Sequence, residues 1–147
     1  MGFTPFPYEL SQAGAEYTYD KLSAEADIIN HHFDNGVPWQ EALHGDPFPR
    51  HIIEDWNYRI AKADVRQKTY VSVTPIASSK DGLAAYRGEN DNMPLPTPWN
   101  KYRFDHENVK TAYLNYCKRV IDFFQPDYFG MSIESNLLYF GRPDLWS

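Results

Sequence analysis

The sequence predicts an α/β fold with four parallel strands and three intervening helices, the arrangement of half a (β/α)8 barrel. Strand-like and helix-like hydrophobic patterns alternate along all 147 residues, an order typical of parallel sheets. The length also matches one ordinary domain with a substantial core. We therefore expect one (βα)3β domain over residues 1–147, with a long loop at about 76–104 after the third strand.

The first three elements are indicated by breaker and cap residues. A strand over 2–6 is closed by two prolines, which have no backbone N–H to donate. Ser11 is a favourable N-cap for a helix that continues to about residue 25. A second strand over 26–33 then ends at a turn-forming Asp-Asn-Gly cluster.

The later elements have clearer patterns. A helix over 49–63 carries isoleucines and a tryptophan at helical spacing, which predicts one buried face. A strand over 68–74 is rich in β-branched and aromatic residues. The third helix begins at Asp105, the expected N-cap, and Pro126 stops it. The fourth strand follows at once, over 127–134.

Composition excludes several classes of partner. The formal charge of −6, without a long Lys/Arg cluster, argues against nucleic acid and anionic membranes. Cys117 is the single cysteine, so no intrachain disulfide can form. No signal peptide, membrane span, phosphate-binding glycine loop or nucleotide fingerprint is present, so we expect a cytoplasmic protein without a cofactor.

Alternation along the strands separates two faces. In the third strand Val71 and Val73 share the face expected against the helices, and Thr74 lies on the inner face. In parallel α/β folds, ligands bind beyond the carboxyl ends of the strands. The inner-face residues at those ends are polar and predict a site: His32, Asp34, Thr74 and Glu134.

Two short segments resemble clan A glycoside hydrolases. The segment DYFGMSIESN, which ends at Asn136, is similar to their fourth strand, where an Asn-Glu pair ends the strand. His32-Phe33-Asp34 resembles a His-aromatic-Ser-Asp segment of the endo-galactanase-like members. The resemblance implies a (β/α)8 barrel that hydrolyses glycosidic bonds with retention of configuration. It places Glu134 at the acid/base position, with Asn136 beside it as a substrate-binding residue.

The chain departs from this family in two ways. Ile133 stands where the family has the Asn that precedes the acid/base. Strands five to eight, with the nucleophile, are absent from these 147 residues. Retaining hydrolysis uses two carboxyl groups about 5–5.5 Å apart, so one chain does not supply the conventional pair. The chain is therefore expected to be a truncated frame or to obtain the second carboxylate from a partner.

The long loop is expected to cover the site. Its aromatic and basic residues suit a lid that stacks on sugar rings or binds anions, with Tyr86 and Trp99 as substrate-binding residues. The alternative is a loop that packs its own aromatics over the open end of the sheet. The other loop residues considered are Tyr102, Arg87 and Arg103.

A metal site is a weaker interpretation of the histidines. His31 and His32 are adjacent on a strand and therefore point to opposite faces, so they do not chelate one ion together. A single-chain site would combine His32, Asp34 and Glu134. We expect a polar pocket without a metal.

Three functions remain open. The leading interpretation is a glycoside-hydrolase-like half barrel with Glu134 as acid/base and a carbohydrate or other small-molecule substrate. The first alternative is a promiscuous phosphate or sulfate ester hydrolase that uses the same pocket, directly or around a metal. The second is a non-catalytic truncated fragment or carbohydrate-binding module.

The chain is also expected to be a homodimer or higher homo-oligomer. The first and fourth strands are expected to have unpaired edges, and Tyr70 and Tyr128 lie on the inner face, where a partner could cover them.

Overall fold

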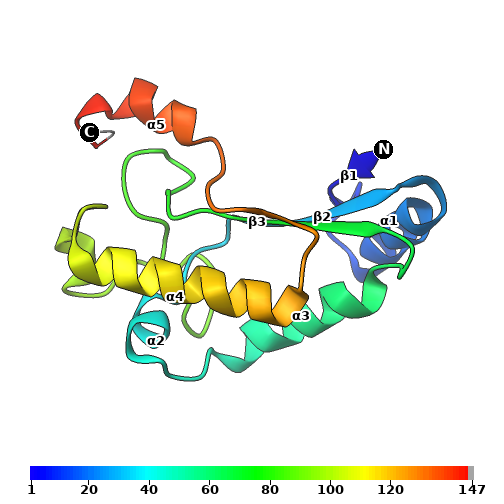
Figure 1. Cartoon of the computed structure of the whole chain (residues 1–147), viewed down its shortest axis with the longest axis horizontal. Helices are drawn as coiled ribbons and strands as arrows, with labels where there is room; N and C mark the ends of the chain where they lie inside the picture. The colour runs from blue at the N-terminus through cyan, green and yellow to red at the C-terminus, as the bar shows by residue number, and fades with distance from the viewer. Residues whose placement is uncertain (146–147) are drawn as a thin grey trace.

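Four parallel strands form one sheet in the order β1-β2-β3-β4 in the computed structural model of the chain (Figure 1). Their bounds are Gly2–Phe3 for β1, Ile28–Phe33 for β2, Lys68–Val73 for β3 and Tyr128–Gly130 for β4. The register places His32 opposite Ser72, and Ser72 opposite Gly130. The structure describes residues 1–145. The last two residues of the predicted domain, Trp146 and Ser147, lie outside the described part.

Helices connect these strands and follow the last one. The α-helices are α1 (Gln12–Glu25), α2 (Trp39–His44), α3 (Arg50–Lys62), α4 (Glu107–Phe124) and α5 (Ser135–Gly141). Two short 3-10 helices, η1 (Trp99–Lys101) and η2 (Pro143–Leu145), lie in the long loop and after α5. The prediction of an α/β chain with four parallel strands is therefore confirmed. No helix in the described part of the chain is long and apolar enough to cross a membrane.

The core lies between the sheet and one layer of helices. Figure 1 shows α3 and α4 below the sheet, with α2 next to α4, and ring contacts of Trp56 join α3 to α4. The sheet contributes Val71 and Val73, which are fully buried, as the alternation predicted. Trp56 of α3 and Tyr116 of α4 fill the space opposite them. In the described part of the chain, no comparable helix layer covers the other face of the sheet (Figure 1), where Tyr128 is 55% exposed although Ser72 and Thr74 are buried.

Two strand ends differ from the sequence prediction. The strand β1 ends at Phe3, because the backbone turns at once, with Phe6 N–H donating to Thr4 C=O. The strand β4 ends at Gly130, because the next carbonyl, of Met131, accepts a 2.6 Å hydrogen bond from the Tyr113 hydroxyl of α4.

Caps explain the helix boundaries. Ser11 caps α1 as predicted, because its Oγ accepts from Gly14 N–H at 3.0 Å. Asp105 is not the cap of α4; His106 is, because its Nδ1 accepts from Asn108 N–H at 3.1 Å. The short helix α2 was not predicted. Its six residues are too few to show the hydrophobic period of a helix. The packing of its buried Trp39 in the core stabilises α2.

Candidate functional site

A row of polar side chains crosses the open face of the sheet. Ser72 of β3 donates from Oγ to Asn30 Oδ1 at 3.3 Å, and the same oxygen lies 3.3 Å from His32 Nδ1. Asn30 in turn donates to Thr4 Oγ1 at 3.2 Å. These contacts fix the His32 ring at the carboxyl end of β2. The division of β2 and β3 into a helix-facing and an inner set therefore follows the predicted alternation.

A hollow of about 240 Å³ lies beyond the carboxyl ends of β2 and β3. It brings together the four residues that the sequence predicted as a site, although they come from three separate segments. The Thr74 hydroxyl accepts from Ile76 N–H at 3.1 Å, which turns the chain into the long loop along one wall. The lining residues are His32, Asp34, Thr74, Ile76, Ser78, Lys80, Ile133 and Glu134.

Glu134 reaches this hollow from a backbone bend rather than from a strand. It lies four residues after the end of β4 and precedes α5, with a left-handed backbone at φ 51°. Residues with a Cβ atom rarely adopt this conformation, because it brings Cβ close to the following carbonyl oxygen and so costs free energy. Its carboxylate Oε2 lies 2.9 Å from the Lys80 ammonium. That ion pair, helped by nearby His32, holds the pKa of Glu134 below its ordinary value.

His32 connects the carboxylates of the hollow to an exposed aromatic ring. Its Nε2 lies 3.8 Å from Asp34 Oδ2. The Phe6 ring packs edge-on against the imidazole, with ring centroids 6.1 Å apart, and 71% of Phe6 is exposed. A flat apolar ring beside hydrogen-bonding groups is an arrangement that suits a sugar, whose faces are apolar and whose edges carry hydroxyls.

The three other predicted binding residues are not part of this hollow. Trp99 is 3% exposed and stacks on Trp39 at 5.5 Å, so its ring has no free face for a sugar. The Tyr86 hydroxyl donates to Glu41 Oε1 at 2.6 Å, and its burial and this bond raise its pKa. Asn136 is exposed on α5, outside the lining residues. These two aromatic side chains of the long loop thus pack against α2, so they have a packing role, as in the alternative interpretation, but their contacts are with α2.

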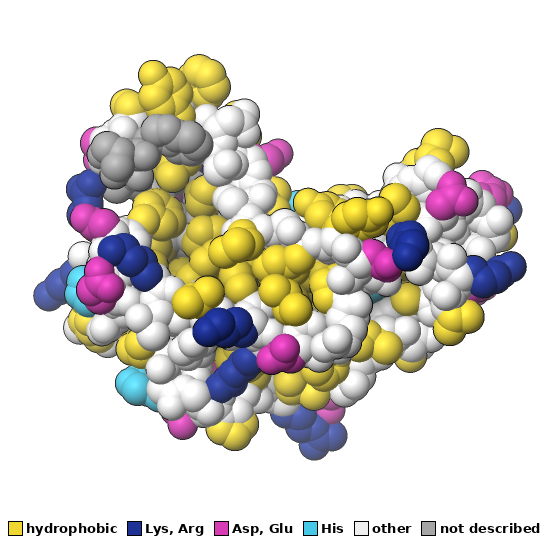
Figure 2. Space-filling model, viewed as in Figure 1, with side chains coloured by type: hydrophobic (Ala, Val, Ile, Leu, Met, Phe, Trp, Pro, Cys, Tyr) yellow, Lys and Arg dark blue, Asp and Glu magenta, His cyan; other side chains and the backbone are white. Residues whose placement is uncertain are grey.

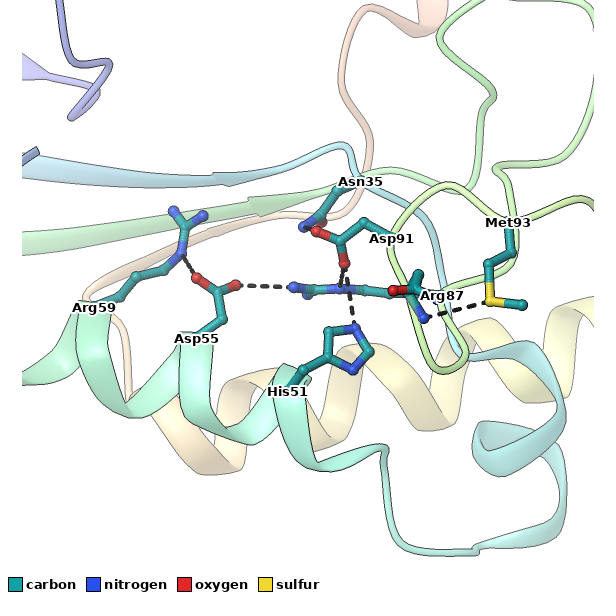
Figure 3. A network of polar contacts seen from close by, with 8 residues as sticks. Asn35, His51, Asp55, Arg59, Arg87, Asp91 and Met93 are labelled. Atoms are coloured by element: carbon teal, nitrogen blue, oxygen red, sulfur yellow. Dashed lines mark hydrogen bonds and ion pairs between the residues drawn. The ribbon is translucent and has the colours of Figure 1, made fainter. Parts of the chain in front are cut away.

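The loop arginines are also used internally. Arg87 is 1% exposed and bonds to Asp55 of α3 at 3.0 Å and to Asp91 at 2.6 Å (Figure 3). Figure 3 shows its side chain extending between these two carboxylates, with His51 of α3 directed at Asp91 from below. Arg103 donates to the carbonyl of Asp144 at 3.0 Å. Arg87 therefore anchors the loop to α3 and does not present its charge to a ligand.

Sequence reasoning missed Lys80, the cation of the hollow. The available signal was its position, since it lies in the first turn after β3, at the carboxyl end of a parallel strand. Its left-handed backbone, with φ 61°, directs the side chain, and such a conformation is not evident from a lysine in a sequence. Ser78 also lines the hollow and was missed.

Two further findings bear on function. Among the residues that the structure describes, no three His, Cys, Asp or Glu side chains are grouped so that they could hold a metal ion. Comparisons with protein families, with curated proteins and with solved structures find no match for this chain. Proposals about function therefore depend on the geometry of the hollow and on the residues that line it.

Proposed function

We propose that this chain is a glycoside-hydrolase-like half barrel, similar to the N-terminal half of a clan A enzyme, with Glu134 as acid/base. The observation that supports it is the meeting of Glu134, His32, Asp34 and Thr74 in one hollow beyond the carboxyl ends of the strands. In (β/α)8 enzymes the reaction takes place at this end of the sheet. The sequential strand order, with α3 and α4 on one face, also fits four successive units of such a barrel.

Each side chain of the hollow has a role in this proposal. Glu134 exchanges a proton with the oxygen of the glycosidic bond and later with water. His32 and Asp34 hydrogen-bond to sugar hydroxyls, and the exposed Phe6 ring stacks on the apolar face of the sugar. Asp34 is the only other carboxylate among the lining residues. The conventional nucleophile, which the resemblance places after a seventh strand, comes from outside the described part of the chain.

We also propose that a second copy of the chain covers the open face of the sheet. Figure 2 shows the molecule hollowed between α5 at one end and β1 with α1 at the other, with hydrophobic side chains gathered along the hollow. Tyr128 of β4, on the same face as Ser72, is 55% exposed. In the sheet that the described residues form, β1 and β4 each have an unpaired edge. A twofold partner would bury this face and could bring a second carboxylate near Glu134.

Light scattering at micromolar concentration tests the dimer. We expect a mass near twice the 17.1 kDa of the chain. Tyr128→Glu, which places a charge on the open face, should shift the population toward the monomer. Val65→Glu is the matched control, because Val65 is fully exposed in the turn between α3 and β3. A monomeric mass at every concentration would contradict the dimer.

The activity is tested with Glu134→Gln on a panel of aryl glycosides and galactans. We expect turnover to fall by about 10²–10⁴-fold, the usual contribution of general acid–base catalysis. Glu25→Gln, an exposed change at the end of α1, serves as the control and should leave turnover unchanged. Equal rates for wild type and Glu134→Gln would remove Glu134 from the reaction. Saturable sugar binding without turnover in the wild type would favour the carbohydrate-binding module instead.

One observation favours the ester hydrolase alternative. Lys80 places an ammonium in the hollow beside His32, and a fixed cation suits a phosphate or sulfate group. Nitrophenyl phosphate and nitrophenyl sulfate test this function in parallel with the glycosides. Hydrolysis of these esters that is lost in Lys80→Met but kept in Glu134→Gln would support the alternative over the glycosidase.

A further inference from the structure

An ion pair in the hollow joins two segments that lie far apart in the sequence. Lys80 is in the loop after β3, Glu134 is in the bend after β4, and Nζ lies 2.9 Å from Oε2. The Lys80 side chain is 20% exposed, whereas that of Glu134 is 58% exposed. The lysine is thus the more enclosed partner, and the carboxylate is the one that faces solvent and an arriving substrate.

The backbone on both sides of this pair is unusual. Lys80 has φ 61° and Glu134 has φ 51°, so both are in the left-handed region that residues with a Cβ atom disfavour. Local hydrogen bonds hold each bend: Lys80 N–H donates to Ala77 C=O, and Leu137 N–H donates to Glu134 C=O, both at 2.9 Å. Strained positions of this kind concentrate at functional sites. Here the two bends bring their side chains into contact with each other.

The other groups around Glu134 leave Lys80 as its main electrostatic partner. On the β2 side, His32 also favours the ionised carboxylate, and Asp34 is the one charged lining group of the same sign. Thr74 and Ser78 contribute neutral hydroxyls from β3 and its loop. The Lys80 hydrogen bond is the largest of the influences that lower the pKa of Glu134.

We propose that Lys80 is a positioning residue that holds Glu134 over the hollow as a carboxylate in the free chain. This inference rests on the proposed glycosidase function and specifies the resting state of its acid/base. A general acid must be protonated before it can donate to a leaving group. Lys80 opposes that state, so the chain is suited to substrates whose leaving group departs without a proton.

This resting state defines a class of substrate. When the bond from the anomeric carbon to oxygen breaks, dinitrophenolate takes the electron pair and leaves as a stable anion that needs no proton. Water supplies the oxygen that forms the new bond to this carbon, and the Glu134 carboxylate takes the proton from that water. A sugar or alkyl alcohol leaves as an alkoxide unless an acid protonates it. We therefore expect activated aryl glycosides to be preferred strongly over alkyl glycosides, and this preference to shrink when Lys80 is replaced by an uncharged residue.

The ionisation of Glu134 is measured directly by carbon-13 NMR of labelled glutamate carboxyls, with Glu134→Gln to assign the signal. In the wild type we expect the signal to titrate below the ordinary glutamate range. In Lys80→Met the midpoint should rise, and in Lys80→Arg, which keeps the charge, it should stay low. Lys118→Met, an exposed change on α4, is the control and should leave the midpoint unchanged.

The outcomes separate this inference from the proposed function. The inference would be overturned if the titration midpoint of Glu134 were equal in the wild type and in Lys80→Met, provided that the amide spectra of both proteins show the native fold. A raised midpoint in Lys80→Met together with no turnover in any variant would support the pairing and contradict the glycosidase. A raised midpoint with an improved relative rate on alkyl glycosides would support both.

Discussion

The buried histidine His31 predicts that the chain loses stability in mild acid. It is 1% exposed on the helix-facing side of β2, and its ring lies 5.6 Å from that of Phe124. Neither ring nitrogen has a hydrogen-bond partner. Burial, assisted by the nearby Arg59 charge, lowers the pKa of His31 to about 4, although Asp55 acts in the opposite direction. His31 therefore binds a proton less readily in the folded chain than in the unfolded chain.

The sign and the size of the effect follow from this pKa. The unfolded histidine titrates near 6.5 and the folded one near 4, so the unfolded state binds more protons between these values. The contribution of His31 to the free energy of unfolding is therefore complete above pH 6.5 and is lost as the pH falls toward 4. The gap corresponds to about 3 kcal/mol of unfolding free energy.

Urea denaturation at several pH values between about 7.5 and 4.5 measures this loss. His31→Leu, which is apolar and similar in size, removes the titration, so its stability should decline much less than that of the wild type over this interval. His44→Gln, an exposed change at the end of α2, should decline as the wild type does. If the wild type and His31→Leu lose stability in parallel, the linkage to His31 is refuted.

Two further predictions concern the long loop, and urea denaturation measures both. Arg87→Ala leaves Asp55 and Asp91 without their buried cation and should lower the unfolding free energy by about 3 kcal/mol, whereas Arg50→Ala, an exposed change on α3, should have little effect. Gly36→Ala should destabilise by about 1–3 kcal/mol, because φ is 107° and the new Cβ would lie 2.8 Å from the carbonyl oxygen of Ala85. Gly82→Ala, where the added atom meets nothing within 4 Å, is the control, and equal stability of the two glycine variants would contradict this reasoning.

Local patterns were enough to predict the sheet and part of the site. Val71 and Val73 alternate with polar neighbours, so their burial follows from the period of a strand. His32 and Glu134 were placed together because the carboxyl ends of parallel strands share one edge. Glu134 nevertheless reaches the hollow through a backbone bend and not through an extended β4. Strand alternation therefore predicted that Glu134 lies at this edge of the sheet, but the residue belongs to the bend before α5 and not to β4.

Features that depend on long-range packing were not predictable. Trp99 was predicted to be an exposed lid residue, but the ring of Trp39 covers it. Trp39 belongs to α2, a helix that was not predicted from the sequence. Lys80 becomes part of the site through a left-handed turn. Hydrophobic period and turn composition report local conformation, whereas these contacts are set by segments that meet only in the folded chain.

The strand order has a consequence for how the chain assembles. Strands that are consecutive in the sequence are neighbours in the described sheet, so β2, β3 and β4 each pair with the strand that precedes them. The central pair β2 and β3 matches along its full length, from Ile28 opposite Lys68 to Phe33 opposite Val73, while β1 and β4 add shorter pairings at the edges. Folding can therefore begin with a β2–β3 nucleus and proceed outward to the edge strands. Amide exchange should follow the same order in reverse, with the edge strands opening before the central pair.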